Sequence, residues 1–343
     1  MKKTIIAVLA LASVVACNKS EVLETTPAEA ITFGSPFIEN STKAIDPSHP
    51  AVELAGFNVY GTVAYNGKVT NIFNGVEVSK TTPTNQGDAA STGGNYGYAT
   101  DKTQYWVEGN TYDFAAIAGA AAATTDDNGM PATIAYTYDN TKQVDLLYAH
   151  NAHGVYNKPQ TGSVASVKFT FDHLLSLVKF TFTNDYAQNT GFVIKVTDVA
   201  INNPYASATY TIDNQTWAGH TSATTPLAFG NATADDAAAG AAALQLAVGA
   251  KASSNYQRLM IPGRYEKLLV SFKVEVIAKD SNGKYFTIDS NTYTDVEVPD
   301  VTFTPGYSYN LTANVTEELD AITFTVEKIN AWRTPSTPDT EIL

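Results

Sequence analysis

Short segments in which apolar and polar residues alternate are the feature that most limits what this 343-residue chain can fold into. In one of them Val167, Phe169 and Phe171 alternate with Lys168 and Thr170. Successive side chains of a β-strand point to opposite faces, so the pattern is typical of a strand with one buried and one wet face. Similar segments recur along the chain, and none is a convincing amphipathic helix. The sequence therefore predicts an all-β fold.

Turn-forming pairs, namely Asn66-Gly67, Asn74-Gly75, Gly109-Asn110 and Asn282-Gly283, separate many of these segments, because Asn and Gly tolerate positive φ. The predicted strands cover residues 57–63, 70–78, 105–107, 112–117, 133–138, 145–149, 167–171, 177–182, 192–199, 208–212, 244–248, 257–261, 268–278, 285–288, 292–298, 308–315 and 322–329. Many short strands with regular turns favour β-sandwiches.

Residues 1–16 are predicted to be a lipoprotein signal peptide and not part of the fold. Lys2 and Lys3 precede an apolar run that is too short to span a bilayer as a stable helix. The run ends in small residues before Cys17, as a lipoprotein signal peptidase requires, so Cys17 is the predicted lipidation site. The alternative is an ordinary signal peptide with a cysteine there by chance. Cys17 is the only cysteine, so a lipidated mature chain has no disulfide and must rely on its core.

The charge balance is acidic. The chain has 34 Asp and Glu residues against 21 Lys and Arg residues, a net charge of -13. Loss of the two lysines of the signal peptide makes it -15. Such a chain repels phosphate backbones, so we expect no nucleic-acid partner.

A polar segment with Pro159 and Gly162, at residues 157–162, lies between two strand-rich halves. We therefore expect an N-terminal β-sandwich over residues 44–160 and a C-terminal one over residues 161–343. Residues 17–43 are expected to form a lipidated propeptide that carries the first strand.

Motifs for catalysis or metal binding are weak. The sequence has no Gly-x-Ser-x-Gly elbow, P-loop or His-Glu-x-x-His motif. His150 and His153, with Asp145 nearby, could be imagined as metal ligands, but a solvated loop after a strand is the simpler interpretation. Residues 126–129 and 280–283 resemble parts of calcium loops without the later bidentate Glu, and are predicted to be turns. We expect no metal, no cofactor and no enzymatic activity.

The three tryptophans allow a second view of function. Trp106, Trp217 and Trp332 could form a platform on which sugars stack, since aromatic faces are flat and apolar. A disulfide-free sandwich, however, needs such residues for its core. A surface glycan-binding lipoprotein of a nutrient-uptake system is therefore the alternative function.

Five phrases of the sequence follow one another in a fixed order. They are the lipobox at Cys17; Ile31-Thr32-Phe33 followed by Ser41-Thr42-Lys43-Ala44; Trp106-x-x-Gly109-x-x-Tyr112-x-Phe114 with Asp145-Leu146-Leu147-Tyr148-Ala149; Phe171-x-His173-Leu174-Leu175; and Phe303-x-Pro305-Gly306-x-x-Tyr309-x-Leu311 with Ile322-Thr323-Phe324-Thr325-Val326 and Trp332. Together they resemble the fimbrillin family, the type V pilins and Mfa-like relatives of Bacteroides-type bacteria.

The resemblance implies two tandem transthyretin-like (Greek-key) sandwiches in a subunit that reaches the outer membrane and cell surface as a lipoprotein. It also implies that a protease removes the first strand and that a neighbouring subunit's C-terminal strand fills the groove. Repetition of this step builds a head-to-tail fimbria that serves adhesion. The implied partners are other fimbrial subunits, the outer-membrane lipid anchor before processing, and host or bacterial surface ligands.

The same resemblance implies roles for particular residues. Cleavage is expected between Lys43 and Ala44, and Ile31 and Phe33 are the expected plugs of the first strand. The candidate donor strand carries Ile322, Phe324, Val326 and Trp332; the alternative is that residues 322–332 form the last strand of their own domain.

One departure concerns the cleavage site. The processing protease of the family prefers Arg, whereas this loop offers Lys43, and the nearest downstream Arg is Arg258. If residues 17–43 stay in place, the chain is an anchor or terminating subunit.

Overall fold

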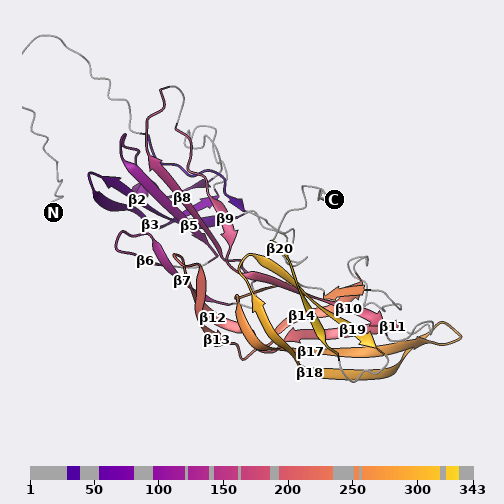
Figure 1. The fold of residues 1–343 in the computed structure, drawn as a ribbon. Coiled ribbons are helices and arrows are strands. Elements are labelled where there is room, and N and C mark those ends of the chain that lie inside the picture. The colour runs from indigo at the N-terminus through magenta and orange to yellow at the C-terminus, as the bar shows by residue number, and fades with distance from the viewer. Residues whose placement is uncertain are drawn as a thin grey trace, which may run out of the picture.

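The computed structural model describes residues 29–38, 54–80, 96–119, 123–138, 143–160, 164–185, 193–234, 251–254, 257–316 and 322–331. Cys17, Lys43, Ala44, Trp332 and the predicted strand at 244–248 lie outside the described residues. Within that part of the chain the structure is built from β-strands, with one short 3-10 helix at Thr100–Lys102, so the all-β prediction is confirmed (Figure 1). The transthyretin-like arrangement and the domain limits stay predictions.

The strands of the first half are β1 (Phe37–Ile38), β2 (Gly56–Tyr65), β3 (Lys68–Lys80), β4 (Tyr96–Gly97), β5 (Thr111–Ala118), β6 (Ala123–Thr125), β7 (Pro131–Thr137), β8 (Leu147–Val155) and β9 (Thr170–His173). Seven of them form one sheet in the order β1-β9-β8-β5-β2-β3-β4. Its core is rich in aromatic rings, among them Phe57, Phe73, Phe114 and Phe169, all at most 3% exposed. Alternation along β2, β3 and β5 places the rings of Phe57, Phe73 and Phe114 on one face.

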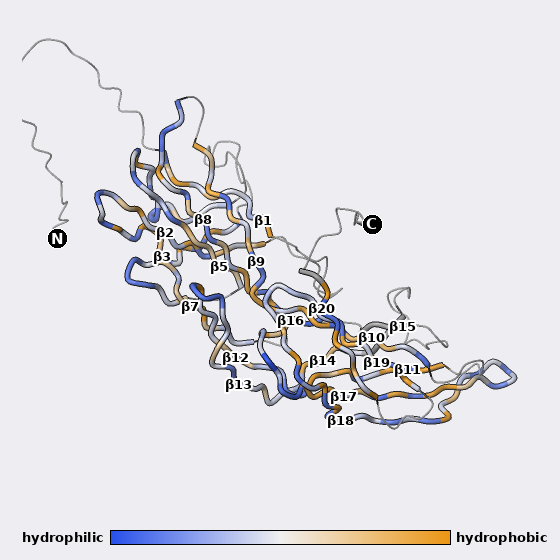
Figure 2. Tube along the Cα trace, in the orientation of Figure 1, coloured by the Kyte–Doolittle hydropathy of each residue, from blue (hydrophilic) through white to orange (hydrophobic). Residues whose placement is uncertain are grey.

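The strands of the second half are β10 (Ser176–Asp185), β11 (Val193–Ile201), β12 (Tyr205–Thr211), β13 (Thr216–Ser222), β14 (Leu227–Ala234), β15 (Lys251–Ser254), β16 (Arg258–Met260), β17 (Gly263–Lys279), β18 (Tyr285–Phe303), β19 (Tyr307–Thr316) and β20 (Phe324–Ala331). Nine of them form a second sheet, in the order β18-β17-β11-β14-β15-β10-β19-β20 with β16 also on β10. The alternating residues Phe272, Val274 and Val276 of β17 lie in its core. Apolar residues occur along these strands, while several of the hairpin turns are hydrophilic (Figure 2).

A third, four-stranded sheet joins the two halves, in the order β13-β12-β7-β6. Strands β6 and β7 come from the first half and β12 and β13 from the second. The halves also share the first sheet across the predicted boundary, because Val167, Phe169 and Phe171 pack into the N-terminal core.

Several local expectations were wrong. Residues 105–107 do not form a strand; Tyr105 makes a single bridge to Ala30. Asn74-Gly75 is not a turn, because β3 runs through it with a register shift and Gly75 has φ 63°, which marks a bulge. The predicted strands 285–288 and 292–298 are one strand, β18. The hairpin turn at Asn282-Gly283 is confirmed between β17 and β18.

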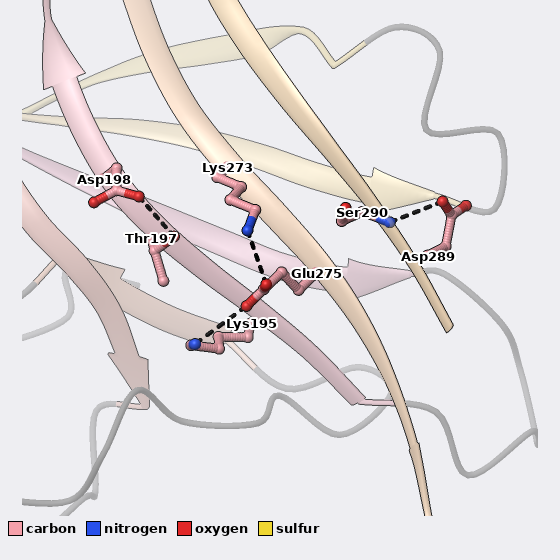
Figure 3. A network of polar contacts seen from close by, with 7 residues as sticks. All are labelled: Lys195, Thr197, Asp198, Lys273, Glu275, Asp289 and Ser290. Atoms are coloured by element: carbon pink, nitrogen blue, oxygen red, sulfur yellow. Dashed lines mark hydrogen bonds and ion pairs between the residues drawn. The ribbon is translucent and has the colours of Figure 1, made fainter. Parts of the chain in front are cut away.

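A polar network around Glu275 lies on the face of β17 opposite the buried Phe272, Val274 and Val276, and Figure 3 shows its contacts. Glu275 of β17 lies opposite Lys195 of β11, and its carboxylate accepts from Lys273 Nζ at 2.9 Å and pairs with Lys195 Nζ at 3.1 Å. Its side chain is only 19% exposed. The hydrogen bonds from Lys273 and then Lys195 hold the pKa of Glu275 below its ordinary value of 4.5.

We predict a pH-dependent effect of Glu275→Gln. A lowered pKa means that the ionised carboxylate stabilises the fold above the ordinary pKa, and this contribution disappears as the pH falls through the folded-state pKa. The variant should lose about 1 kcal/mol or less in free energy of unfolding at neutral pH, and the difference should vanish in acid. Urea denaturation across pH measures both. Glu297→Gln, whose exposed partner Lys267 lies 2.8 Å away, is the matched control and should have almost no effect. An equal loss for both variants at every pH would contradict the prediction.

Candidate strand-exchange groove

Residues 29–38 run as an extended segment between two other parts of the first half. On one side, the backbone N–H of Ile31 donates to Gln104 O at 2.8 Å, and the N–H of Trp106 donates to Glu29 O at 2.9 Å. Ala30 forms an antiparallel bridge with Tyr105 at the same place. Residues 104–106 therefore form one wall of a groove that the segment occupies.

The other wall is the chain that leads into β9. Val167 N donates to Thr32 O at 2.8 Å, and Gly34 N donates back to Val167 O at 2.9 Å. Phe37 N donates to Phe169 O at 2.9 Å, which begins the parallel pairing of β1 with β9. The segment is thus hydrogen-bonded on both edges, as an inner strand of a sheet is.

The predicted plugs occupy the core. Ile31 is fully buried and Phe33 is 2% exposed. The Phe33 ring lies 5.4 Å from that of Phe73 and 5.9 Å from that of Phe169, centroid to centroid, in edge and stacked arrangements. Such ring pairs add to the free energy gained by burial. The two residues belong to the same apolar cluster as the rest of the N-terminal core.

Side chains of the walls also hold the segment. Tyr98 Oη donates to Ile31 O at 2.6 Å, and burial raises the pKa of Tyr98, so the phenol keeps its proton. Glu29 Oε2 accepts from Val164 N at 3.0 Å. Sequence reasoning missed these residues, since Tyr98 and Ile31 are 67 positions apart and no local pattern links them.

The described candidate donor residues pack in their own domain. Strand β20 pairs antiparallel with β19 at the edge of the second sheet. The Phe324 ring lies 5.6 Å from that of Phe180 and 5.7 Å from that of Phe272. Ile322 is 6% exposed and Val326 packs against the same core. In this single chain they hold the place of a last strand of their own domain.

The imagined metal ligands do not converge. His150 and His153 lie in strand β8, not in a loop, because the strand extends to Val155. His150 Nε2 lies 2.8 Å from a carboxylate oxygen of Asp113, whereas the carboxylate of Asp145 pairs with His173. Among the described residues, no group of three or more His, Cys, Asp or Glu is placed to hold a metal ion.

The loops that resemble calcium sites are turns, as predicted. The Oδ1 of Asp126 accepts the backbone N–H groups of Asn128 and Met130, both at 2.9 Å. Asp280 accepts from Asn282 and Lys284 in the same way, at 2.9 and 2.8 Å. Each carboxylate oxygen therefore serves the backbone of its own turn.

The two tryptophans that lie within the described residues make contacts inside the fold. Trp106 is 5% exposed, stacks on Tyr156 at 4.8 Å and lies 4.6 Å from the His153 ring. Trp217 Nε1 donates to Leu174 O at 3.0 Å. Trp106 thus offers no open face to a sugar and is not available for the sugar-stacking platform considered from the sequence.

The sequence profile of the fimbrillin-like family matches residues 55–332. The chain belongs to the fimbrillin-like family. The match covers both halves of this fimbrillin-like chain and the junction between them, and membership implies a cell-surface location and other fimbrial subunits as partners. A search of curated proteins found no match.

Several solved structures are similar to this chain. A fimbrial protein from Bacteroides vulgatus superposes with a TM-score of 0.61 at 17% identity, over 88% of this chain and 99% of that chain. A proposed cell adhesion protein from Bacteroides ovatus gives 0.47 at 15% identity, over 89% and 97%. A fimbrial assembly protein from Parabacteroides distasonis gives 0.36 at 14%, over 79% and 87%. Because the Bacteroides vulgatus protein is only 17% identical, its similarity shows a common fold and nothing about function.

Within the described part of this fimbrillin-like chain, no helix is both long and apolar enough to cross a bilayer.

The occupied groove generates a stability prediction. Phe33→Ala should lower the free energy of unfolding of the unprocessed chain by about 3–5 kcal/mol, because it empties a buried aromatic site. Phe37→Ala, four residues along the same segment, is the control: Phe37 is 62% exposed and its loss should cost no more than about 0.5 kcal/mol. Urea denaturation of both variants measures the difference. Similar losses would mean that the segment is not part of the N-terminal core.

Proposed function

We propose that this chain is a structural subunit of a surface fimbria that assembles by strand exchange and serves adhesion, without enzymatic activity. Membership of the fimbrillin-like family supports the fimbrial part. The exchange part is supported by one observation above all: residues 29–38 are hydrogen-bonded on both edges and bury Ile31 and Phe33 in the core, although the segment precedes the family-matched region.

Removal of the segment would expose a defined vacancy. The five backbone hydrogen bonds named above would be lost, which leaves polar groups of Gln104, Trp106, Val167 and Phe169 without partners. In the open groove these groups would bond to water, so pairing each of them again with a strand adds only about 0.5–1.5 kcal/mol net. The pockets of Ile31 and Phe33 would open as well, each worth about 1.5–3 kcal/mol when refilled. A strand from a neighbour can satisfy both needs by β-augmentation.

The contact is head-to-tail. A groove in the first half of one copy would take a strand from the C-terminal region of another, so the two surfaces differ. Such heterologous contacts build a filament when the rotation does not close into a ring. A fimbria is that filament.

Export and anchoring complete the proposal. Cys17 would carry the acyl chains that hold the chain at the outer membrane before processing, since durable anchoring needs more than one chain. Cleavage after Lys43 would then free the mature subunit, with Ala44 as its first residue. Host or bacterial surface ligands are the partners that the adhesive role would require.

We predict that Lys43→Ala blocks processing and polymer formation. With the segment retained, the groove stays filled and the neighbour's strand cannot enter. The measurements are N-terminal sequencing of surface material, expected to start at Ala44 in the wild type, and SDS-resistant ladders. Lys68→Ala changes an exposed lysine at the start of β3 and should leave both unchanged. Wild-type surface material that still begins at Cys17 would count against processing at Lys43.

The donor strand is tested separately, because Ile322 and Phe324 already pack in their own domain and deletion would disturb it. A synthetic peptide with residues 322–334 should bind the processed subunit, raise its thermal midpoint and suppress ladder formation. A peptide with the same composition in scrambled order is the control, since it lacks the alternating apolar row. If neither peptide has an effect on the processed subunit, the donated strand is not this one.

A further inference from the structure

The junction sheet, made of β6, β7, β12 and β13, ties the two halves together through backbone. Strands β7 and β12 pair antiparallel over five residue pairs, from Ser207 opposite Thr137 to Thr211 opposite Thr133. Tyr138 N donates to Ala206 O at 2.7 Å beyond one end, and Ile212 N donates to Ala132 O at 3.0 Å beyond the other. The halves are therefore joined by a continuous ladder and not only by the covalent chain.

An apolar core lies under this ladder. Ile134 of β7 is fully buried, and Ala208 and Tyr210 of β12 are 4% and 5% exposed. Their cluster takes further members from both halves, namely Tyr60, Ala115, Ile117 and Leu146 from the first and Leu177, Leu259 and Ile261 from the second. Separation of the halves would expose this shared surface to water. The free energy gained by burying it is the main contribution that holds the halves together.

Two buried or half-buried hydrogen bonds cross the same junction. Leu259 N donates to Gln143 Oε1 at 2.8 Å, and Gln143 is 8% exposed. Trp217 Nε1, from β13, donates to Leu174 O at 3.0 Å, in the link between β9 and β10. Because this link carries the chain from the first sheet to the second, the bond holds the place where the two sheets are covalently joined.

We propose that the junction sheet is a mechanical strap that makes the two halves one cooperative unit and transmits tension along the filament. In a head-to-tail polymer each subunit is pulled at its groove and at its tail. Without the strap, the link through Leu174 and Leu175 would carry that pull and let the halves rotate. The role under tension rests on the proposed function; the coupling of the halves does not, since it exists in the single chain.

The test breaks the ladder on one edge of β12 at a time. Alternate residues of a strand pair with the same neighbour, so Ala206, Ala208, Tyr210 and Ile212 face β7, as the bonds of Ala206 and Ile212 show. Ala208→Pro removes an N–H that pairs with β7, because proline has no donor. Thr209→Pro makes the same change toward β13 and is the matched control.

Native-state hydrogen exchange on the unprocessed full chain is the measurement. In the wild type, the slowest amides of β5 and β17 should share one opening reaction and respond equally to low denaturant. Ala208→Pro should separate the two halves by at least about tenfold in exchange rate, and Thr209→Pro should not. In single-molecule pulling between the chain ends, the wild type and Thr209→Pro should rupture once, and Ala208→Pro twice.

If Ala208→Pro does not fold, Gln143→Met carries the same expectation with a smaller separation of about fivefold, because it removes the hydrogen bond from Leu259 N across the junction and keeps the size of the side chain. Two results would contradict the proposal that the junction sheet couples the halves. One is separate opening of the two halves in the wild type, and the other is equal effects of both proline variants. Hydrogen exchange and pulling are both measured on the monomer, so a failure of the proposed strand exchange would not change these results.

Discussion

The N-terminal half depends on the insertion of residues 29–38 between two walls that come from distant parts of the chain. The insertion satisfies backbone groups on both edges of the segment and places Phe33 among aromatic rings in the same step. Backbone pairing alone would add little net free energy, since water offers the same bonds. The buried plugs supply the driving force and the ladder supplies the register. A foreign strand must meet both conditions to take this place.

The C-terminal edge presents the opposite situation. Among the described strands, β20 pairs with β19 alone, yet Phe324 lies within 5.6 to 6.1 Å of the rings of Phe180, Phe182 and Phe272. A donor strand that starts from such a place gives up contacts in its own domain. The free energy of exchange is then the difference between burying these side chains in a neighbour's groove and burying them in their own domain. Its sign depends on which of the two sites fits them better. The proposed processing step makes exchange more favourable, because it removes residues 29–38 and leaves the groove empty.

The junction sheet changes how the two halves are understood. The domain boundary at residues 160 and 161 stays a prediction, but the pairing of β7 with β12 joins residues from its two sides, and Val167 belongs to the N-terminal core. A shared core beneath the crossing ladder means that each half is incomplete alone. The polar network around Glu275 lies outside these features and contributes at the surface of the second sheet only.

The sequence by itself determined the all-β class, most strand positions, the turns at Asp126 and Asp280, and the family, because alternation and turn chemistry are local properties of the chain. It also singled out Ile31 and Phe33, through their place in a family phrase. Only the tertiary structure decided what these residues touch. Tyr105 is a groove wall and not a strand, and the histidines of β8 have separate partners. Such pairings join residues far apart in sequence, and the free energy that selects them comes from burial that no local window contains.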